Sequence, residues 1–138
     1  MSTQYVTFTL GEHLYGIDVA DVQEVLPSRA AARVPLAGPD VAGLINLRGQ
    51  VVLALDLRTR LGLPPREQTE QMMVVVTLGP EPVSLLVDQI GDVAETSDDQ
   101  FETPPQTLSS ELRDVIRGAY KLDDRLLLAL DVAAVTAA

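Results

Sequence analysis

The chain has 138 residues, 46% of them hydrophobic and 22% charged, which suits one ordinary globular domain or two small ones that share a core. Its net charge of −10 disfavours binding to nucleic acid, because affinity for phosphate backbones depends on lysine and arginine. Without cysteine, and with His13 as the only histidine, the sequence excludes disulfides and leaves little for a metal site or another cofactor. No apolar run approaches the roughly 20 residues of a membrane span, and no signal peptide precedes the first segment, so we expect a cytoplasmic protein without direct membrane insertion.

The first segments of the chain predict a β-hairpin. Apolar and polar residues alternate from Val6 to Leu10, Gly11-Glu12-His13 supplies a polar turn, and a second run extends from Leu14 to Ile17. The next piece, Val19 to Leu26, fits either a short helix with one apolar face or a bent strand, and both alternatives stay open. The Ala- and Pro-rich stretch from Arg29 to Pro39 predicts an extended connection.

A second hairpin is predicted between Gly43 and Leu57, where two apolar runs flank the tip Asn46-Leu47-Arg48-Gly49. Gly49 supplies the positive φ that a tight turn needs, and Asn46 tolerates left-handed geometry. We therefore expect Arg48 to be held at a rigid tip.

The residues after this hairpin predict a short helix. Asp56 can cap a helix from Leu57 to Leu61, and Gly62 and Pro64 stop it. The charged stretch from Pro64 to Gln71 contains prolines and marks the boundary between two modules.

The second half begins with another predicted hairpin. It runs from Met73 to Leu78, turns at Gly79-Pro80-Glu81-Pro82 and returns from Val83 to Val87. Asp88 to Val93 leaves the same choice between helix and bent strand as its counterpart in the first half.

Two stretches of the chain are repeated. Tyr5 to Val25 aligns without a gap with Met73 to Val93, an offset of 68 residues, and Gly43 to Leu57 aligns with Gly118 to Val132, an offset of 75. The second copy therefore has a net seven extra residues, which predict a surface loop around Thr96 to Ser110. A repeat of this length suits two similar small β modules packed together.

Comparison of the two copies shows which residues they share and which belong to one copy alone. The tip Asn46-Leu47-Arg48-Gly49 corresponds to Lys121-Leu122-Asp123-Asp124, so the arginine belongs to the first copy alone. Asp56 and Asp131 occupy matching positions and could suggest a paired-carboxylate site of the aspartic peptidase kind. The bulky residues that follow each aspartate argue against that site, and helix capping explains both.

Other candidate sites receive little support. His13 has no nucleophile or metal partner nearby in the sequence, and Gly43, Gly49 and Gly62 lie in separate turns that match no phosphate-binding motif. With no tryptophan, three tyrosines and two phenylalanines, the aromatic surface is too small for a polyproline groove. We expect no enzymatic activity; exposed strand edges and aliphatic patches favour protein–protein contacts.

Four motifs carry a family resemblance over nearly the whole chain. They are FTLGEHLYGIDVADVQEV (Phe8 to Val25), VPLAGPDVAGLINLRGQVVLALDLRTRLGLP (Val34 to Pro64), SLLVDQIGDV (Ser84 to Val93) and DDRLLLALDV (Asp123 to Val132). In their order and spacing they resemble the CheW-type coupling proteins. The resemblance implies a mainly β fold of two pseudo-symmetric, five-stranded SH3-like β barrels with short helical connections. The whole chain, 1–138, would be a single CheW-like domain with an approximate first barrel at 5–66, a second at 71–135, and strands at the seam open to exchange.

The resemblance also implies a function. It is that of a non-catalytic adaptor, or scaffold, that couples the cytoplasmic tips of methyl-accepting chemoreceptors to a CheA-type histidine kinase in a chemosensory array. Matched residue by residue, the receptor-binding surface of the family would comprise Val22, Glu24, Gly43, Asn46, Arg48, Ile90 and Val93. As an alternative to receptor binding, Arg48 could form a salt bridge to Glu24 that only fixes the hairpin. The two roles can coincide.

A second reading keeps the same surfaces but changes the role. The chain would then be a free-standing regulatory module that competes for or caps kinase and receptor surfaces in a non-flagellar chemosensory pathway. The sequence starts almost at the first predicted strand and stops at Ala138, so we expect neither a long C-terminal helix nor a receiver domain.

Overall fold

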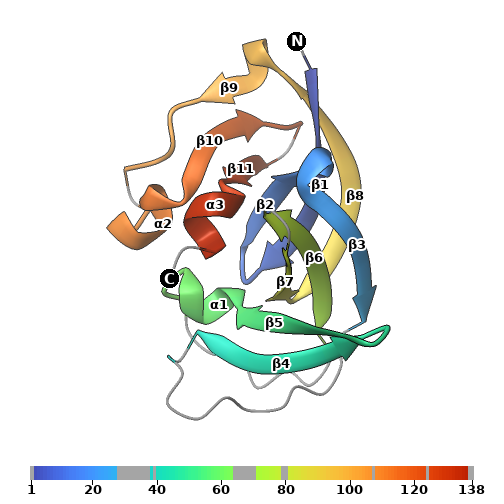
Figure 1. The fold of residues 1–138 in the computed structure, drawn as a ribbon. Coiled ribbons are helices and arrows are strands. Elements are labelled where there is room, and N and C mark those ends of the chain that lie inside the picture. Colours follow the sequence, from blue (N-terminus) through green and yellow to red (C-terminus); the bar gives the residue numbers. More distant parts are fainter. Residues whose placement is uncertain are drawn as a thin grey trace.

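The computed structural model describes residues 2–27, 38, 40–63, 71–78, 81–106, 108–123 and 125–136. The fold is mainly β, with short helices, as predicted (Figure 1). Its elements are β1 (Ser2–Leu10), β2 (His13–Asp18), the 3₁₀ turn η1 (Val19–Asp21), β3 (Val22–Pro27), β4 (Val41–Leu47), β5 (Gln50–Asp56), α1 (Leu57–Arg60), β6 (Met72–Leu78), β7 (Glu81–Val87), β8 (Gln89–Ser97), the 3₁₀ turn η2 (Asp98–Gln100), β9 (Phe101–Glu102), α2 (Ser110–Asp114), β10 (Ile116–Lys121), β11 (Leu126–Leu130) and α3 (Val132–Thr136).

The strands form two sheets that each combine both copies of the repeat. One sheet has the order β8-β1-β2-β11-β10-β9, and the other has the order β3-β6-β7-β5-β4. The first hairpin, β1–β2, thus lies among strands of the second copy, and its counterpart β6–β7 lies among strands of the first. The division into barrels at 5–66 and 71–135 stays a prediction; the sheet order shows that the two copies exchange their hairpins.

Strand register confirms the repeat and both of its offsets. In the parallel pairs, Leu53 lies opposite Val83 and Leu128 lies opposite Tyr15, and these two pairs are related by the offsets of 75 and 68 residues. A register shift follows Val41 in the β4–β5 ladder and Ile116 in the β10–β11 ladder, again at matching positions. The copies therefore share their irregularities as well as their strands.

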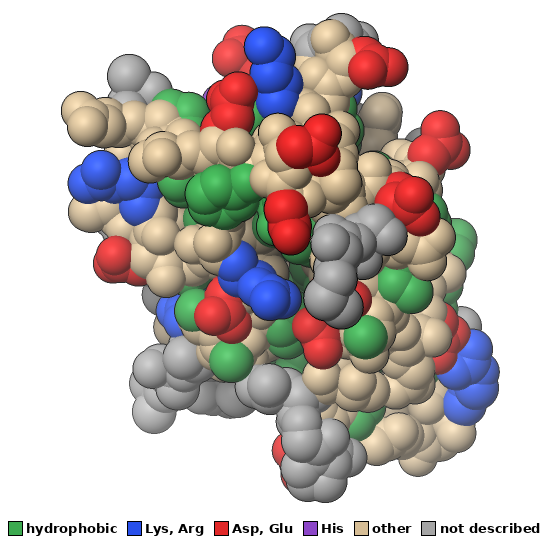
Figure 2. Space-filling model, turned by 90° about the horizontal axis from the view of Figure 1, so that it is seen from above, with side chains coloured by type: hydrophobic (Ala, Val, Ile, Leu, Met, Phe, Trp, Pro, Cys, Tyr) green, Lys and Arg blue, Asp and Glu red, His purple; other side chains and the backbone are tan. Residues whose placement is uncertain are grey.

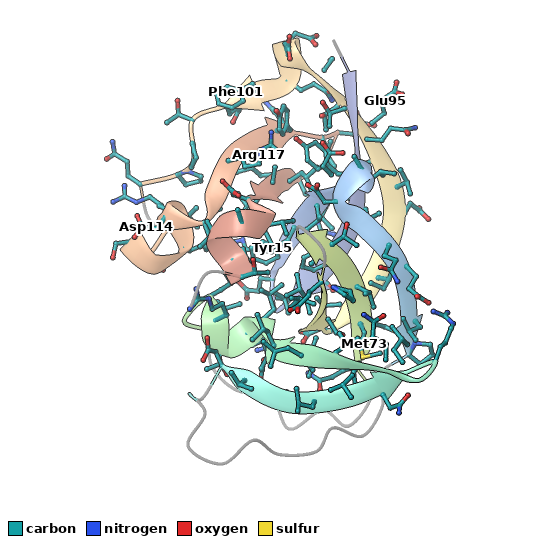
Figure 3. All side chains as sticks on the ribbon, viewed as in Figure 1. Tyr15, Met73, Glu95, Phe101, Asp114 and Arg117 are labelled. Atoms are coloured by element: carbon teal, nitrogen blue, oxygen red, sulfur yellow. The ribbon has the colours of Figure 1, made fainter. Side chains whose placement is uncertain are left out.

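Three apolar clusters stabilise the fold. Alternate residues of a strand face opposite sides of a sheet, so in β6 Val74 and Val76 point into the central cluster while Met73 and Val75 point into a second one on the far face. The central cluster lies between the sheets, and Tyr15 is fully buried in it (Figure 3). A third cluster, around Tyr5, is the counterpart of the second.

Several predicted elements change in detail. Val19 to Leu26 is neither a helix nor a strand throughout, because a 3₁₀ turn leads into strand β3. The turn predicted at Gly79-Pro80-Glu81-Pro82 is too long, since Glu81 and Pro82 pair within β7. The loop predicted around Thr96 to Ser110 contains η2 and strand β9, which pairs with β10.

Other predicted segments cannot be compared with the structure. Gly79, Pro80, the boundary at 64–70 and the connection at 29–37 lie outside the described residues. In the described part of the chain no helix is long and apolar enough to cross a membrane.

The predicted helix after the second hairpin is confirmed as α1. The Asp56 carboxylate accepts hydrogen bonds from the backbone N–H groups of Arg58, at 3.1 Å, and Thr59, at 3.5 Å. At the other end Gly62 has a φ of 76°, and its N–H and that of Leu63 donate to carbonyls of the last turn. This left-handed ending needs glycine, as the sequence indicated.

Candidate functional site

The tip of the β4–β5 hairpin is a two-residue turn formed by Arg48 and Gly49. Leu47 pairs with Gln50, and Arg48 and Gly49 have φ angles of 54° and 84°. Positive φ at both positions is typical of a type I′ turn, for which asparagine and glycine are the preferred residues. The prediction that Asn46 belongs to the turn at the tip is wrong. Asn46 lies in β4, and its side-chain oxygen accepts a hydrogen bond from the Gly49 N–H at 2.8 Å.

The guanidinium of Arg48 forms the predicted pair with Glu24. Nη1 donates to Oε2 at 2.5 Å and Nη2 donates to Oε1, so both branches of the fork are engaged. These hydrogen bonds raise the pKa of Arg48 above its usual value, and attraction to the carboxylate adds to the effect. The Arg48 side chain remains 64% exposed against 20% for Glu24, so the arginine is available at the surface while its geometry is fixed.

Backbone irregularities position the residues around this pair. The β3–β6 ladder shifts register between Val22 and Glu24, and a bulge of this kind re-aims the side chains next to it. Gly43, beside the bulge in β4, is buried and has a φ of 145°, a conformation that other residues rarely adopt. Val22 is half-buried and packs against the central cluster.

The two remaining predicted residues lie on β8, in the other sheet. Ile90 is half-buried and packs against the central cluster, as does Val22, its counterpart in the repeat. Val93 is 57% exposed and lies opposite Val6. The structure therefore brings Glu24, Asn46 and Arg48 together at one hairpin tip and places Ile90 and Val93 on a strand of the opposite sheet.

Sequence reasoning missed a buried ion pair that joins the sheets. Arg58 donates to both carboxylate oxygens of Asp88, from Nε at 2.9 Å and from Nη2 at 2.6 Å, and the Gly11 N–H donates to the same carboxylate at 3.0 Å. The side chains are only 12% and 3% exposed, and the hydrogen bonds to Asp88 raise the pKa of Arg58 despite its burial. The repeat offered a signal, because alanines stand at the corresponding positions, Ala133 and Ala20.

The alternative catalytic sites remain without geometric support. The Asp131 carboxylate accepts the Ala134 N–H at 3.3 Å at the start of α3, as Asp56 does at α1. His13 is exposed, with its ring edge-on to Tyr15. Among the described residues no three histidine or acidic side chains gather into a potential metal site. Acidic side chains are scattered over the face seen in Figure 2 and form no single patch.

Comparison with known proteins identifies the family. The family model of the CheW-like domain matches residues 4–138. The chain belongs to the CheW family. Among curated relatives, the chemotaxis protein CheW of Bacillus subtilis is 30% identical over 131 residues, which cover 94% of this chain and 84% of that one. CheW of Treponema pallidum is 29% identical over 136 residues, with coverage of 94% and 79%.

A solved structure extends the similarity to three dimensions. The scaffolding protein TtCheW from Thermoanaerobacter tengcongensis matches with a TM-score of 0.83 at 28% identity, and the alignment covers 94% of this chain and 89% of that one. The CheW-like fold predicted from the sequence is thereby confirmed.

Proposed function

We propose that this CheW-family chain is a non-catalytic, cytoplasmic scaffold that couples chemoreceptor tips to a CheA-type histidine kinase. The match to the CheW-like domain over residues 4–138 carries the proposal, since it leaves almost no part of the chain for another activity. The similarity to chemotaxis proteins and to a structure described as a scaffolding protein supports it. Its two sheets also present separate surfaces, as an adaptor with two partners requires.

The receptor-binding surface is proposed to centre on Arg48. An arginine occupies a left-handed turn position where asparagine or glycine would be less strained, and such outliers are often retained for function. Glu24 fixes the guanidinium in one orientation, which reduces the conformational entropy lost when a partner binds. Five further residues complete the proposed surface: Val22, Gly43, Asn46, Ile90 and Val93.

The test is a three-component binding experiment. The chain is incubated with receptor-containing membranes, with the kinase, and with both, and bound protein is measured by co-sedimentation. A scaffold should bind each partner separately and should bring more kinase to the membranes than membranes alone retain. If the chain instead lowers the amount of kinase on the membranes, it competes or caps, and the scaffold proposal fails.

A further inference from the structure

A groove opens on the sheet that contains β8, whereas the Arg48 tip belongs to the other sheet. It has a volume of about 350 Å³ and lies between β8, β1, β2 and the tip of the β10–β11 hairpin. Thr7, Leu14, Ile90, Asp92, Ala94 and Leu122 are among the residues that line it. We call it the β8 groove.

The repeat maps the β8 groove onto the Arg48 tip. With the offset of 68 residues Asp92 corresponds to Glu24, and with the offset of 75 Asp123 corresponds to Arg48. The strand register supports this mapping, because a shift precedes Glu24 in the β3–β6 ladder and a matching shift occurs beside Asp92 in the β1–β8 ladder. The β8 groove is thus the second copy's version of the proposed receptor-binding tip.

Smaller side chains line the β8 groove than occupy the corresponding positions of the first copy. Leu26 packs against the apolar cluster of the first copy, whereas the corresponding position in the groove is occupied by Ala94. Gly91 stands in place of Gln23, and a Cβ at Gly91 would lie only 2.6 Å from the Thr7 hydroxyl oxygen. A side chain at this position would therefore push the Thr7 hydroxyl aside.

The second copy also lacks the ion pair that Arg48 and Glu24 form in the first copy. Arg48 bridges to Glu24, but the corresponding residues Asp123 and Asp92 are both acidic and cannot form such an ion pair. Within the described part of the chain the Asp92 carboxylate has no hydrogen-bond or ion-pair partner. Arg125 lines the groove too, yet forms no ion pair with Asp92 among those residues.

We propose that the β8 groove receives an arginine side chain from a protein partner. The aliphatic stem would lie along Leu14, Ala94 and Leu122, where it replaces the volume of Leu26, and the guanidinium would pair with Asp92 as Arg48 pairs with Glu24. Arginine fits better than lysine because its planar fork can engage both oxygens of a carboxylate. This contact rests on the proposed function, because Ile90 lines the groove and also belongs to the proposed receptor-binding surface, and it deepens that function by naming the partner side chain by its chemistry.

The test uses the whole chain and a small probe. The ¹⁵N-labelled protein is titrated with the acetylated tripeptide amide Ala-Arg-Ala, and amide shifts are followed by NMR; the same peptide with citrulline, which is uncharged and of similar shape, is the control ligand. Saturable shifts are expected on Gly91, Asp92 and Leu122, with affinity for the citrulline peptide at least about fivefold weaker, since hydrogen bonds between charged groups are the stronger ones.

Three variants test where the probe binds. Asp92→Asn should weaken binding of the arginine peptide by about fivefold or more, and Ala94→Leu should abolish it by filling the groove. Glu95→Gln makes the same change of charge on the same strand, but Glu95 is not among the residues that line the groove and projects outward (Figure 3), so binding should not change.

Failure would be equally clear. Equal shifts with both peptides, or equal losses in Asp92→Asn and Glu95→Gln, would overturn the proposal, because general acidity would then explain the binding. So would undiminished binding in an Ala94→Leu variant with a folded amide spectrum. None of these outcomes depends on receptor or kinase binding, so they leave the proposed function untouched.

Discussion

Neutralising Asp88 should be the most damaging single charge change in this chain. Its carboxylate accepts hydrogen bonds from Nε and Nη2 of Arg58 and from the Gly11 N–H, in a site where it is 3% exposed. Asp88→Asn leaves a guanidinium, itself only 12% exposed, without its counter-charge. Breaking a buried ion pair in this way costs about 3–5 kcal/mol of unfolding free energy, a large part of the stability of a small domain.

A nearby pair supplies the matched control. Arg60 and Asp40 are joined at 3.3 Å, but their side chains are 25% and 27% exposed, so Asp40→Asn should cost only about 0–1 kcal/mol. Urea unfolding followed by far-UV circular dichroism measures both variants. Adding Arg58→Met to Asp88→Asn removes the stranded charge and keeps an acceptor for Gly11, so about 2 kcal/mol should return. Equal losses for Asp88→Asn and Asp40→Asn would refute the reasoning.

Three further outcomes are expected. Burial raises the pKa of Tyr15 to about 12, so the contribution of its neutral form to stability is complete below pH 10 and is lost as the pH rises towards 12. Over that pH range the urea midpoint of Tyr15→Phe should fall less than that of the unmodified chain. An equal fall would contradict the assignment. Replacing either capping aspartate, Asp56 or Asp131, with alanine should lower the unfolding free energy by about 1 kcal/mol without affecting partner binding, as denaturation and co-sedimentation would show. Arg48→Glu should weaken binding to receptor membranes with kinase binding intact; if exchanging the charges of Arg48 and Glu24 restores receptor binding, the arginine is mainly an internal brace.

The hairpin shows how far sequence reasoning reached. Its strands, the Arg48–Glu24 pair and the Asp56 cap were predictable, because each depends on residues close together in the chain or on a motif with a known structural role. The geometry of the tip was not. Asn46 looked like a turn residue, but Leu47 is 4% exposed, and the need to bury it keeps both residues in the strand and moves the turn to Arg48 and Gly49.

Contacts between distant segments account for most of what was missed. Alternation in the sequence shows which face of a strand is buried but not which strand lies beside it, so the sheet partners of β1 and β6 could not be derived. Arg58 and Asp88 are 30 residues apart and meet only because α1 and the β7–β8 junction converge. The β8 groove depends on the differing sizes of Leu26 and Ala94, which matter only once the two positions are known to be equivalent.

The exchange of hairpins has a consequence for how the protein folds and arose. Neither half of the chain can complete a sheet until the other has been synthesised, so we expect cooperative folding without a stable half-folded state. A chain with one copy alone would leave β1–β2 without the strands on which it packs, yet two such chains could satisfy each other as a symmetric, domain-swapped dimer. The present protein has the architecture that fusion of such a dimer into one polypeptide would produce, which frees each copy to change its tip independently.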